Sequence, residues 1–163
     1  MEDIVYYRVT ENDIEVLVDT RVRFLIELFG EQPAEKIEEL KNNLKSYFTK
    51  SIKNELYICY LAKHGNTVVG VGGMLIREQP GSFKNPIGKV GYIMNMYTSP
   101  SHRRRGICSA IVERIEHEGR EKGIFAFELH ATKEGEFVYV QHDFKIHSEP
   151  TYRKYITASV PLK

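Results

Sequence analysis

The stretch at positions 90–109, VGYIMNMYTSPSHRRRGICS, combines a basic loop with the start of a helix. Residues 92–98 are aromatic, aliphatic or Thr apart from one Asn, which is typical of a buried strand, and Pro100 ends it because proline cannot donate to a sheet. After Gly106 the apolar residues recur at helical spacing, so the three arginines at 103–105 lie between strand and helix. The first N–H groups of a helix lack partners and lie at the positive end of its dipole. The stretch therefore predicts an anion site, most simply for phosphate.

Composition places the chain among ordinary soluble globular proteins. It has 163 residues, 42% of them hydrophobic and 28% charged, which suits one domain over residues 1–163 with a substantial core. The formal net charge of +1 favours neither nucleic acid nor an anionic membrane as partner. No leader-like segment or membrane-spanning apolar run is present, so we expect a cytoplasmic protein. The two cysteines, Cys59 and Cys108, form neither a disulfide framework nor a metal site.

Hydrophobic periodicity predicts an α/β fold, a mixed sheet flanked by helices. A possible capping box at Thr10–Asp13 precedes the first helix, and Gly30 ends that helix. Gly70, Gly72 and Gly73 are interpreted as close-packing or bulge positions, since no dinucleotide-binding pattern follows them. The expected order is β-α-α-β-β-β-α-β-α-β. The strands are expected at 4–9, 56–62, 67–76, 92–98 and 125–132, the helices at 14–29, from 33 to 48, 107–123 and 134–142, and a final strand or pair at 144–155.

Two motifs and the element order resemble one protein family. Arg103-x-x-Gly106-x-Cys108, between strand and helix, is similar to the Gln/Arg-x-x-Gly-x-Gly/Ala signature of the GCN5-related N-acetyltransferases, with Cys108 in place of Gly or Ala. The family often has Tyr-x-x-x-Gly-Phe near its end, and Tyr139 to Phe144 resembles it with Asp143 at the glycine. Asp tolerates the left-handed backbone conformation better than most residues. The resemblance covers nearly the whole chain and implies the family's fold.

The resemblance implies acetyl-CoA as cosubstrate and no metal. Its pyrophosphate would bind the backbone amides of residues 104–109, with arginine side chains at the rim, and its pantetheine would pair with the strand backbone near Met96 and Thr98. Thr132 stands where relatives often carry an Asn that touches the cofactor. The implied cofactor-binding residues are Met96, Tyr97, Thr98, Arg103, Arg104, Arg105, Gly106, Ile107, Cys108, Ser109 and Thr132.

The resemblance also implies direct attack of a primary amine on the thioester, through a tetrahedral intermediate. Tyr139 matches the tyrosine that donates a proton to the departing sulfur. Histone-type relatives carry a glutamate on the central strand, where this chain has Tyr92. The base that accepts the amine proton therefore stays open. The candidates are His130, Glu128, Glu27 and Glu31.

Other functions remain as alternatives. A catalytically inactive acetyl-CoA sensor would bind the cofactor without turnover, given the departures at Cys108, Thr132 and Asp143. A nucleic-acid module would need a wider basic face than residues 102–105 provide, and His142 and His147 lack the further ligands of a metal site. Cys108 is excluded as an acetyl carrier, because it would lie at the pyrophosphate. The acceptor amine is unidentified, and its selection is assigned to residues 78–88 and the first two helices. A homodimer is possible.

Overall fold

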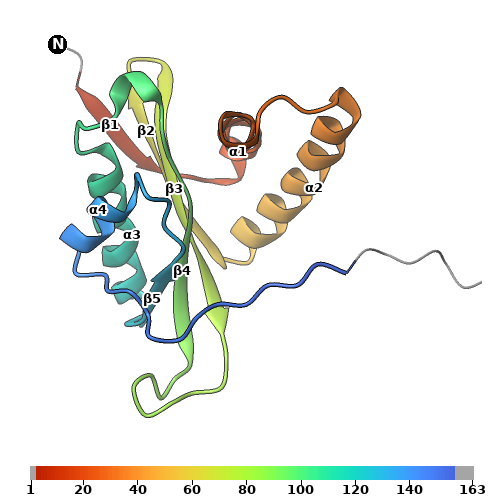
Figure 1. The fold of residues 1–163 in the computed structure, drawn as a ribbon. Coiled ribbons are helices and arrows are strands. Elements are labelled where there is room, and N and C mark those ends of the chain that lie inside the picture. The colour runs from red at the N-terminus through yellow and green to blue at the C-terminus, as the bar shows by residue number, and fades with distance from the viewer. Residues whose placement is uncertain (1–2, 157–163) are drawn as a thin grey trace, which may run out of the picture.

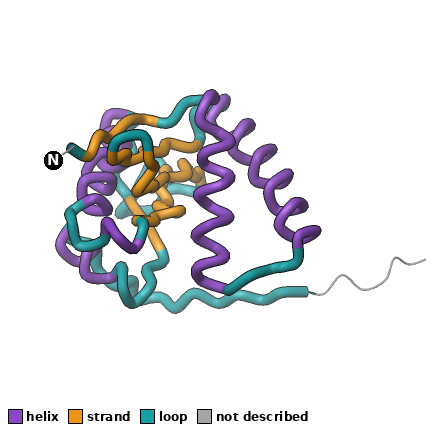
Figure 2. The backbone as a smooth tube through the Cα atoms, turned by 90° about the horizontal axis from the view of Figure 1, so that it is seen from above, coloured by secondary structure: helices purple, strands orange, loops and turns teal. Residues whose placement is uncertain are grey.

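The sheet has five strands and separates two layers of helices (Figures 1 and 2). A computed structural model describes residues 3–156. The strand order is β1-β2-β3-β4-β5, antiparallel except for the parallel pair β4–β5, so the predicted α/β class with a mixed sheet is confirmed. The strands are β1 (Ile4–Arg8), β2 (Tyr57–His64), β3 (Thr67–Glu78), β4 (Lys89–Thr98) and β5 (Phe127–Leu129). The helices are α1 (Ile14–Phe29), α2 (Ala34–Lys53), α3 (Ile107–Glu121) and α4 (Glu136–Gln141), with short 3-10 turns at Glu11–Asp13 and Pro100–His102.

Each face of the sheet packs against its own helices. One core joins the sheet to α1 and α2, with Leu17, Phe48 and Tyr57 buried in it. The other joins the sheet to α3, with Ile111 and Ile115 fully buried. Figure 2 shows α1 and α2 on one side of the strands and α3 on the other. The apolar stripes seen in the sequence face these two cores, as amphipathic helices require.

Helix α1 begins and ends as its sequence predicts. The Thr10 N–H donates to Asp13 Oδ2 at 2.9 Å, and Asn12 N–H donates to Thr10 Oγ1 at 3.3 Å, which completes the capping box. The box lies on a 3-10 turn that leads into α1. Gly30 ends the helix with φ of +79°, a conformation that glycine adopts without steric strain.

The glycines of β3 are close-packing positions, as predicted. A Cβ at Gly72 would overlap Met96 and Ile111 on the α3 side, and one at Gly73 would overlap the Tyr57 ring on the other side. The register between β3 and β4 shifts next to these glycines. Two large side chains can therefore lie directly against the strand.

The predicted final strand at 144–155 is wrong. Residues 144–156 form no strand and run along the end of the molecule opposite the Arg103–Gly106 loop (Figure 1). Pro150 has no N–H for a ladder, and the apolar side chains of Ile146 and Tyr152 are both 89% exposed. The alternation of this segment suits a strand, but strand residues gain stability only when they pair with a sheet edge.

Strand β5 is shorter than predicted, three residues instead of 125–132. It pairs with β4 only from Gly91 to Ile93, the last partners being Ile93 and Leu129. Beyond this point β4 carries a bulge, and residues 130–132 have no strand to pair with. The loop at 79–88, expected to shape the acceptor pocket, lies at the opposite end of β4 from the basic loop (Figure 1).

Candidate functional site

The loop before α3 presents a row of unpaired backbone N–H groups. Gly106 is the N-cap of α3 with φ of +77°, and Arg104 is also left-handed, with φ of +58°. Within residues 3–156, the N–H groups of residues 104–109 make no hydrogen bond. No atom lies within 4 Å of where a Gly106 Cβ would stand. The loop therefore has the donors, the helix-dipole orientation and the free space that a phosphate group requires.

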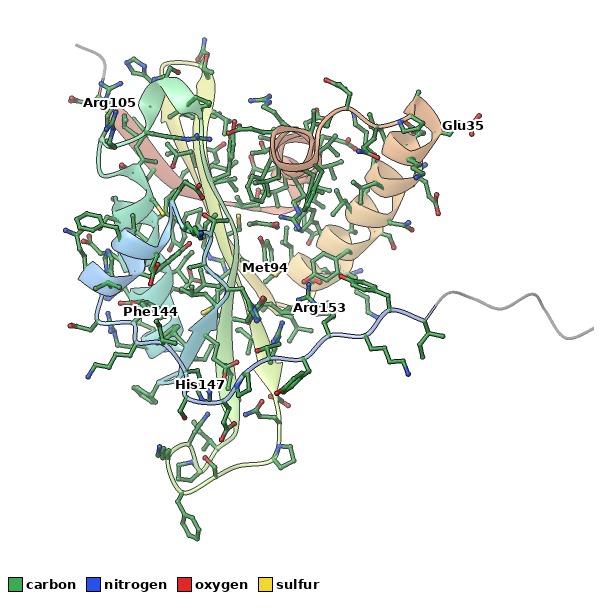
Figure 3. The ribbon with its side chains drawn as sticks, in the orientation of Figure 1. Glu35, Met94, Arg105, Phe144, His147 and Arg153 are labelled. Atoms are coloured by element: carbon green, nitrogen blue, oxygen red, sulfur yellow. The ribbon has the colours of Figure 1, made fainter. Side chains whose placement is uncertain are left out.

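The three arginines of the loop have different surroundings. Arg103 Nε donates to the Thr98 carbonyl at 3.0 Å, and its Nη2 donates to the Glu27 carboxylate. Arg103 thus fastens the loop to β4 and α1. Arg104 and Arg105 are exposed and take part in none of the ion pairs of the described chain, and Figure 3 shows Arg105 at the α3 end of the loop. These two side chains are free to meet an anion.

The edge of β4 is open next to this loop. Its register with β3 passes from Gly73–Met94 to Val71–Tyr97, so β4 has one extra residue in a bulge. Asn95 in that bulge has φ of +57°. Since β5 pairs with β4 only as far as Ile93, the edge from Met94 to Thr98 has no strand partner among the described residues. Met96 and Thr98, near which the pantetheine is expected to pair, lie on this open edge.

Tyr139 is buried beside the start of α3. Its side chain is 7% exposed, and its ring lies 6.0 Å from that of Phe144. Burial, and then the nearby Cys108 thiol, raise the pKa of Tyr139 well above its usual value. The hydroxyl is therefore protonated at every physiological pH and is available as a proton donor. Asp143 has φ of +63°, so it takes the left-handed conformation predicted for it.

The helix start also holds Cys108, Ser109 and His142. Burial raises the pKa of the Cys108 thiol to about 11, which makes it a poor nucleophile at neutral pH. The Ser109 hydroxyl lies 2.5 Å from His142 Nε2 and links α3 to the end of α4. The sequence indicated His142 only as a weak metal candidate, so this contact was missed. Thr132 is exposed, and its Oγ1 accepts a hydrogen bond from Gly135 N–H at 3.2 Å at the entry to α4.

The four candidate bases for the amine proton lie in different parts of the structure. The Tyr92 hydroxyl lies 2.6 Å from His130 Nδ1. Glu128 is opposite Tyr92 in the β4–β5 register and is exposed. The hydrogen bond from Arg103 lowers the pKa of Glu27, which weakens Glu27 as a base. Glu31 is exposed in the connection between α1 and α2.

Asn95 is a buried polar residue whose position the sequence did not explain. Its Nδ2 donates to the Tyr57 hydroxyl at 2.9 Å, whereas its Oδ1 has no hydrogen-bond partner in the described chain. An Asn inside an apolar strand tolerates the left-handed conformation, which was the available signal for a bulge. The residue borders a small hollow that faces α1. The hollow is lined by Leu17, Thr20, Arg21, Phe24, Val71, Asn95 and Tyr97.

Residues 3–156 contain no group of three or more His, Cys, Asp or Glu side chains arranged to hold a metal ion. None of their helices is both long enough and apolar enough to cross a bilayer. A larger hollow between α1 and α2, lined mainly by apolar side chains such as Leu25 and Phe29, includes none of the predicted cofactor residues.

The fold and the site together define a class of protein. A mixed sheet with an open central strand edge, leading into a helix whose N-terminal amides are unpaired, suits a long ligand that ends in phosphates. The chain belongs to the acetyltransferase (GNAT) family, whose model matches residues 21–138. No curated protein is significantly similar to the chain.

Solved structures agree with this assignment. A predicted acetyltransferase with acetyl-CoA from Clostridium acetobutylicum is 30% identical, with a TM-score of 0.84 over 93% of this chain and 96% of the other. A GCN5-related N-acetyltransferase from Ralstonia eutropha JMP134 is 25% identical, with a TM-score of 0.80 over 93% and 99% of the two chains. An aminoglycoside acetyltransferase from an uncultured soil metagenomic sample is 17% identical, with a TM-score of 0.67 over 96% and 99%, and shows likeness of fold alone.

Proposed function

We propose that this protein is an acetyl-CoA-dependent N-acetyltransferase that acts on a primary amine. The observation that carries the proposal is the open edge of β4, from Met94 to Thr98, which leads into the unpaired amides of residues 104–109. Family membership and the similar acetyltransferase with acetyl-CoA support it.

The chain's own groups suit each part of acetyl-CoA. The amides of residues 104–109 hold the pyrophosphate, with Arg104 and Arg105 adding charge, while Arg103 positions the loop through Thr98. The backbone of β4 at Met96 and Thr98 offers the edge for an extended chain. Bound acetyl-CoA supplies an acetyl group activated as a thioester. The bulge leaves backbone N–H groups outside the β3 ladder, and such donors stabilise a developing oxyanion.

Two side-chain groups handle the protons. Tyr139, kept neutral by its burial, donates to the departing thiolate. The Tyr92–His130 pair takes a proton from the ammonium group of the acceptor, which then attacks as a neutral amine, because an imidazole nitrogen is a proton acceptor and the pair lies where β5 ends beside β4. Glu27 is already engaged by Arg103 and is therefore assigned no part in this transfer.

Calorimetric titration with acetyl-CoA tests the cofactor site. Gly106→Trp should abolish binding, because its side chain fills the space before the unpaired amides. Gly123→Trp is a matched control. Gly123 follows the other end of α3 with φ of +74°, close to the +77° of Gly106, and neither position has an atom within 4 Å of its Cβ. The two variants share the same backbone strain, and only one alters the site.

Three outcomes are informative. Binding by wild type and Gly123→Trp but not by Gly106→Trp supports the site. No binding by folded wild-type protein overturns the proposal. Binding by wild type without turnover of any primary amine favours the alternative of an acetyl-CoA sensor.

A further inference from the structure

Two arginines on the α1/α2 side of the sheet lack carboxylate partners. Arg21 lies on α1 and is partly buried, and Arg77 lies on β3. In the described part of the chain neither is within 4 Å of a carboxylate oxygen, whereas Arg8, Arg103 and Arg120 each form an ion pair. The carboxylates of α1 form ion pairs with other residues and not with these two arginines. Glu15, Asp19 and Glu27 are paired with Lys45, Lys41 and Arg103.

Each of these arginines contacts an aromatic side chain on this face of the sheet. The guanidinium carbon of Arg77 lies 3.6 Å from the centroid of the Tyr92 ring. That of Arg21 lies 5.4 Å from the Phe24 ring centroid, and burial, offset in part by Tyr57 and Tyr92, lowers the pKa of Arg21. These contacts hold two cations against the face on which Met94 lies, which Figure 3 shows toward α1 and α2.

A cation without a partner loses hydration when it is partly buried. An arginine remains protonated in proteins, so Arg21 keeps its charge in this setting. Burial of a charge is unfavourable unless an opposite charge or hydrogen-bond acceptor meets it. A carboxylate is the group that satisfies a guanidinium best, since it accepts two parallel hydrogen bonds. No carboxylate of the described residues meets Arg21, so this face suits an anionic ligand.

A second unsatisfied group lies next to the bulge. The Asn95 Oδ1 is buried without a hydrogen-bond partner, and the hollow that Asn95 borders is also lined by Arg21 and Thr20. A carbonyl oxygen needs a donor, and a water molecule is one. The hollow measures about 10 Å³, the size of one water molecule, so it is too small to admit the acceptor amine.

We propose that the acetyl acceptor is a primary amine that also carries a carboxylate, such as an amino acid, with Arg21 and Arg77 binding the carboxylate. This inference rests on the proposed function, because it names the acceptor of that reaction. The same charges oppose polycationic amines, since two unpaired arginines repel a second cation.

The test compares amino acids with their carboxamides in wild-type protein. Each pair keeps the side chain and the primary amine, and kcat/KM is calculated on the concentration of neutral amine, because replacement of the carboxylate also lowers the pKa of the α-ammonium group. We expect kcat/KM to be about 10- to 100-fold higher for the acids, the ratio that corresponds to one or two charge-assisted hydrogen bonds. Arg77→Gln and Arg21→Gln should lower kcat/KM for the acid by about 10-fold or more relative to the amide, because any effect of Arg77 through the Tyr92 ring is common to both substrates. Arg120→Gln, on α3 at the opposite face of the sheet, is the control and should change neither.

A binding measurement separates this inference from the proposed function. Calorimetry with the N-acetylated acid, the product, in the presence of CoA should give a dissociation constant that rises in Arg77→Gln. The acetyl-CoA dissociation constant should not change in either arginine variant. Loss of acetyl-CoA binding in wild type would overturn the proposed function. Intact acetyl-CoA binding with acids and amides used equally well would overturn the carboxylate assignment alone.

Arg77→Gln keeps the test valid if Arg21→Gln does not fold. Arg77 is exposed, so its replacement leaves the core packing intact, and circular dichroism verifies the fold of each variant. The acid–amide comparison in wild type needs no substitution. Equal kinetics in wild type overturn the inference whatever the variants do.

Discussion

The burial of Tyr139 suits it to one chemical role, that of proton donor. Replacement by Phe removes the hydroxyl and keeps the ring that packs near Phe144. We expect kcat to fall by about 100-fold, the size of a lost general acid, with the acetyl-CoA dissociation constant nearly unchanged. Steady-state kinetics with the amine that gives turnover, together with acetyl-CoA titration, measure both.

Tyr152→Phe is the matched control for that experiment. Tyr152 is 89% exposed on the segment after α4, so loss of its hydroxyl should leave kcat unaltered. An unchanged kcat in Tyr139→Phe would remove Tyr139 from the chemistry and leave it a core residue.

The reactivity of the Cys108 thiol tests whether burial at the start of α3 raises its pKa. Burial raises its pKa to about 11, so the thiolate is scarce at neutral pH. We expect iodoacetamide to modify Cys108 very slowly at pH 7.5, and the rate to rise about tenfold per pH unit toward that pKa because only the thiolate reacts. Mass spectrometry at several pH values measures this, with urea-unfolded protein as the control that reacts quickly. Rapid modification of the folded protein at pH 7.5 would contradict the burial of this thiol.

At the scale of elements, the close approach of β3 to β4 and α3 depends on Gly72. A Cβ there would overlap Met96 and Ile111, so Gly72→Ala should lower the free energy of unfolding by about 1–3 kcal/mol through overpacking. Urea denaturation measures the change. In a Met96→Ala background the same substitution should be less destabilising, because the overlapping sulfur is gone. Equal effects in both backgrounds would show that Met96 is not the obstruction.

The bulge in β4 has a larger influence on the site than any other local feature. It ends the pairing with β5 after Ile93, frees the strand edge up to Thr98 and turns Asn95 toward α1. One extra residue in one strand therefore creates the proposed cofactor edge.

At the scale of the whole molecule, acetyl-CoA should stabilise the fold. A ligand that binds only the folded state adds about 2.7 kcal/mol at 100 times its dissociation constant. For a chain of 163 residues this corresponds to a rise in Tm of about 5–10 °C. Differential scanning calorimetry with and without acetyl-CoA measures it, with sodium acetate as the control ligand. An unchanged Tm at saturating acetyl-CoA would contradict the proposed site.

The sequence by itself determined the fold class, most of the element order and the arrangement of strand, basic loop and helix around Gly106. These features depend on local signals: apolar periodicity, the Thr10–Asp13 cap, and a glycine at the start of α3. It also located the left-handed Asp143, whose side chain tolerates that conformation. Local patterns suffice here because the helices are amphipathic and bury one face, while β2 and β3 are apolar runs buried on both faces.

The tertiary structure alone decided which groups meet. Two contacts join residues that are far apart in the chain: the pairing of Arg103 with Glu27 and the Tyr92–His130 contact. Packing also brings the unpartnered Arg21 and Asn95 to the same hollow. The tertiary structure also overturned the final strand at 144–155, because an extended pattern becomes a strand only where a sheet edge accepts it. Register and side-chain partners depend on packing between elements, and that information is not contained in any single stretch of sequence.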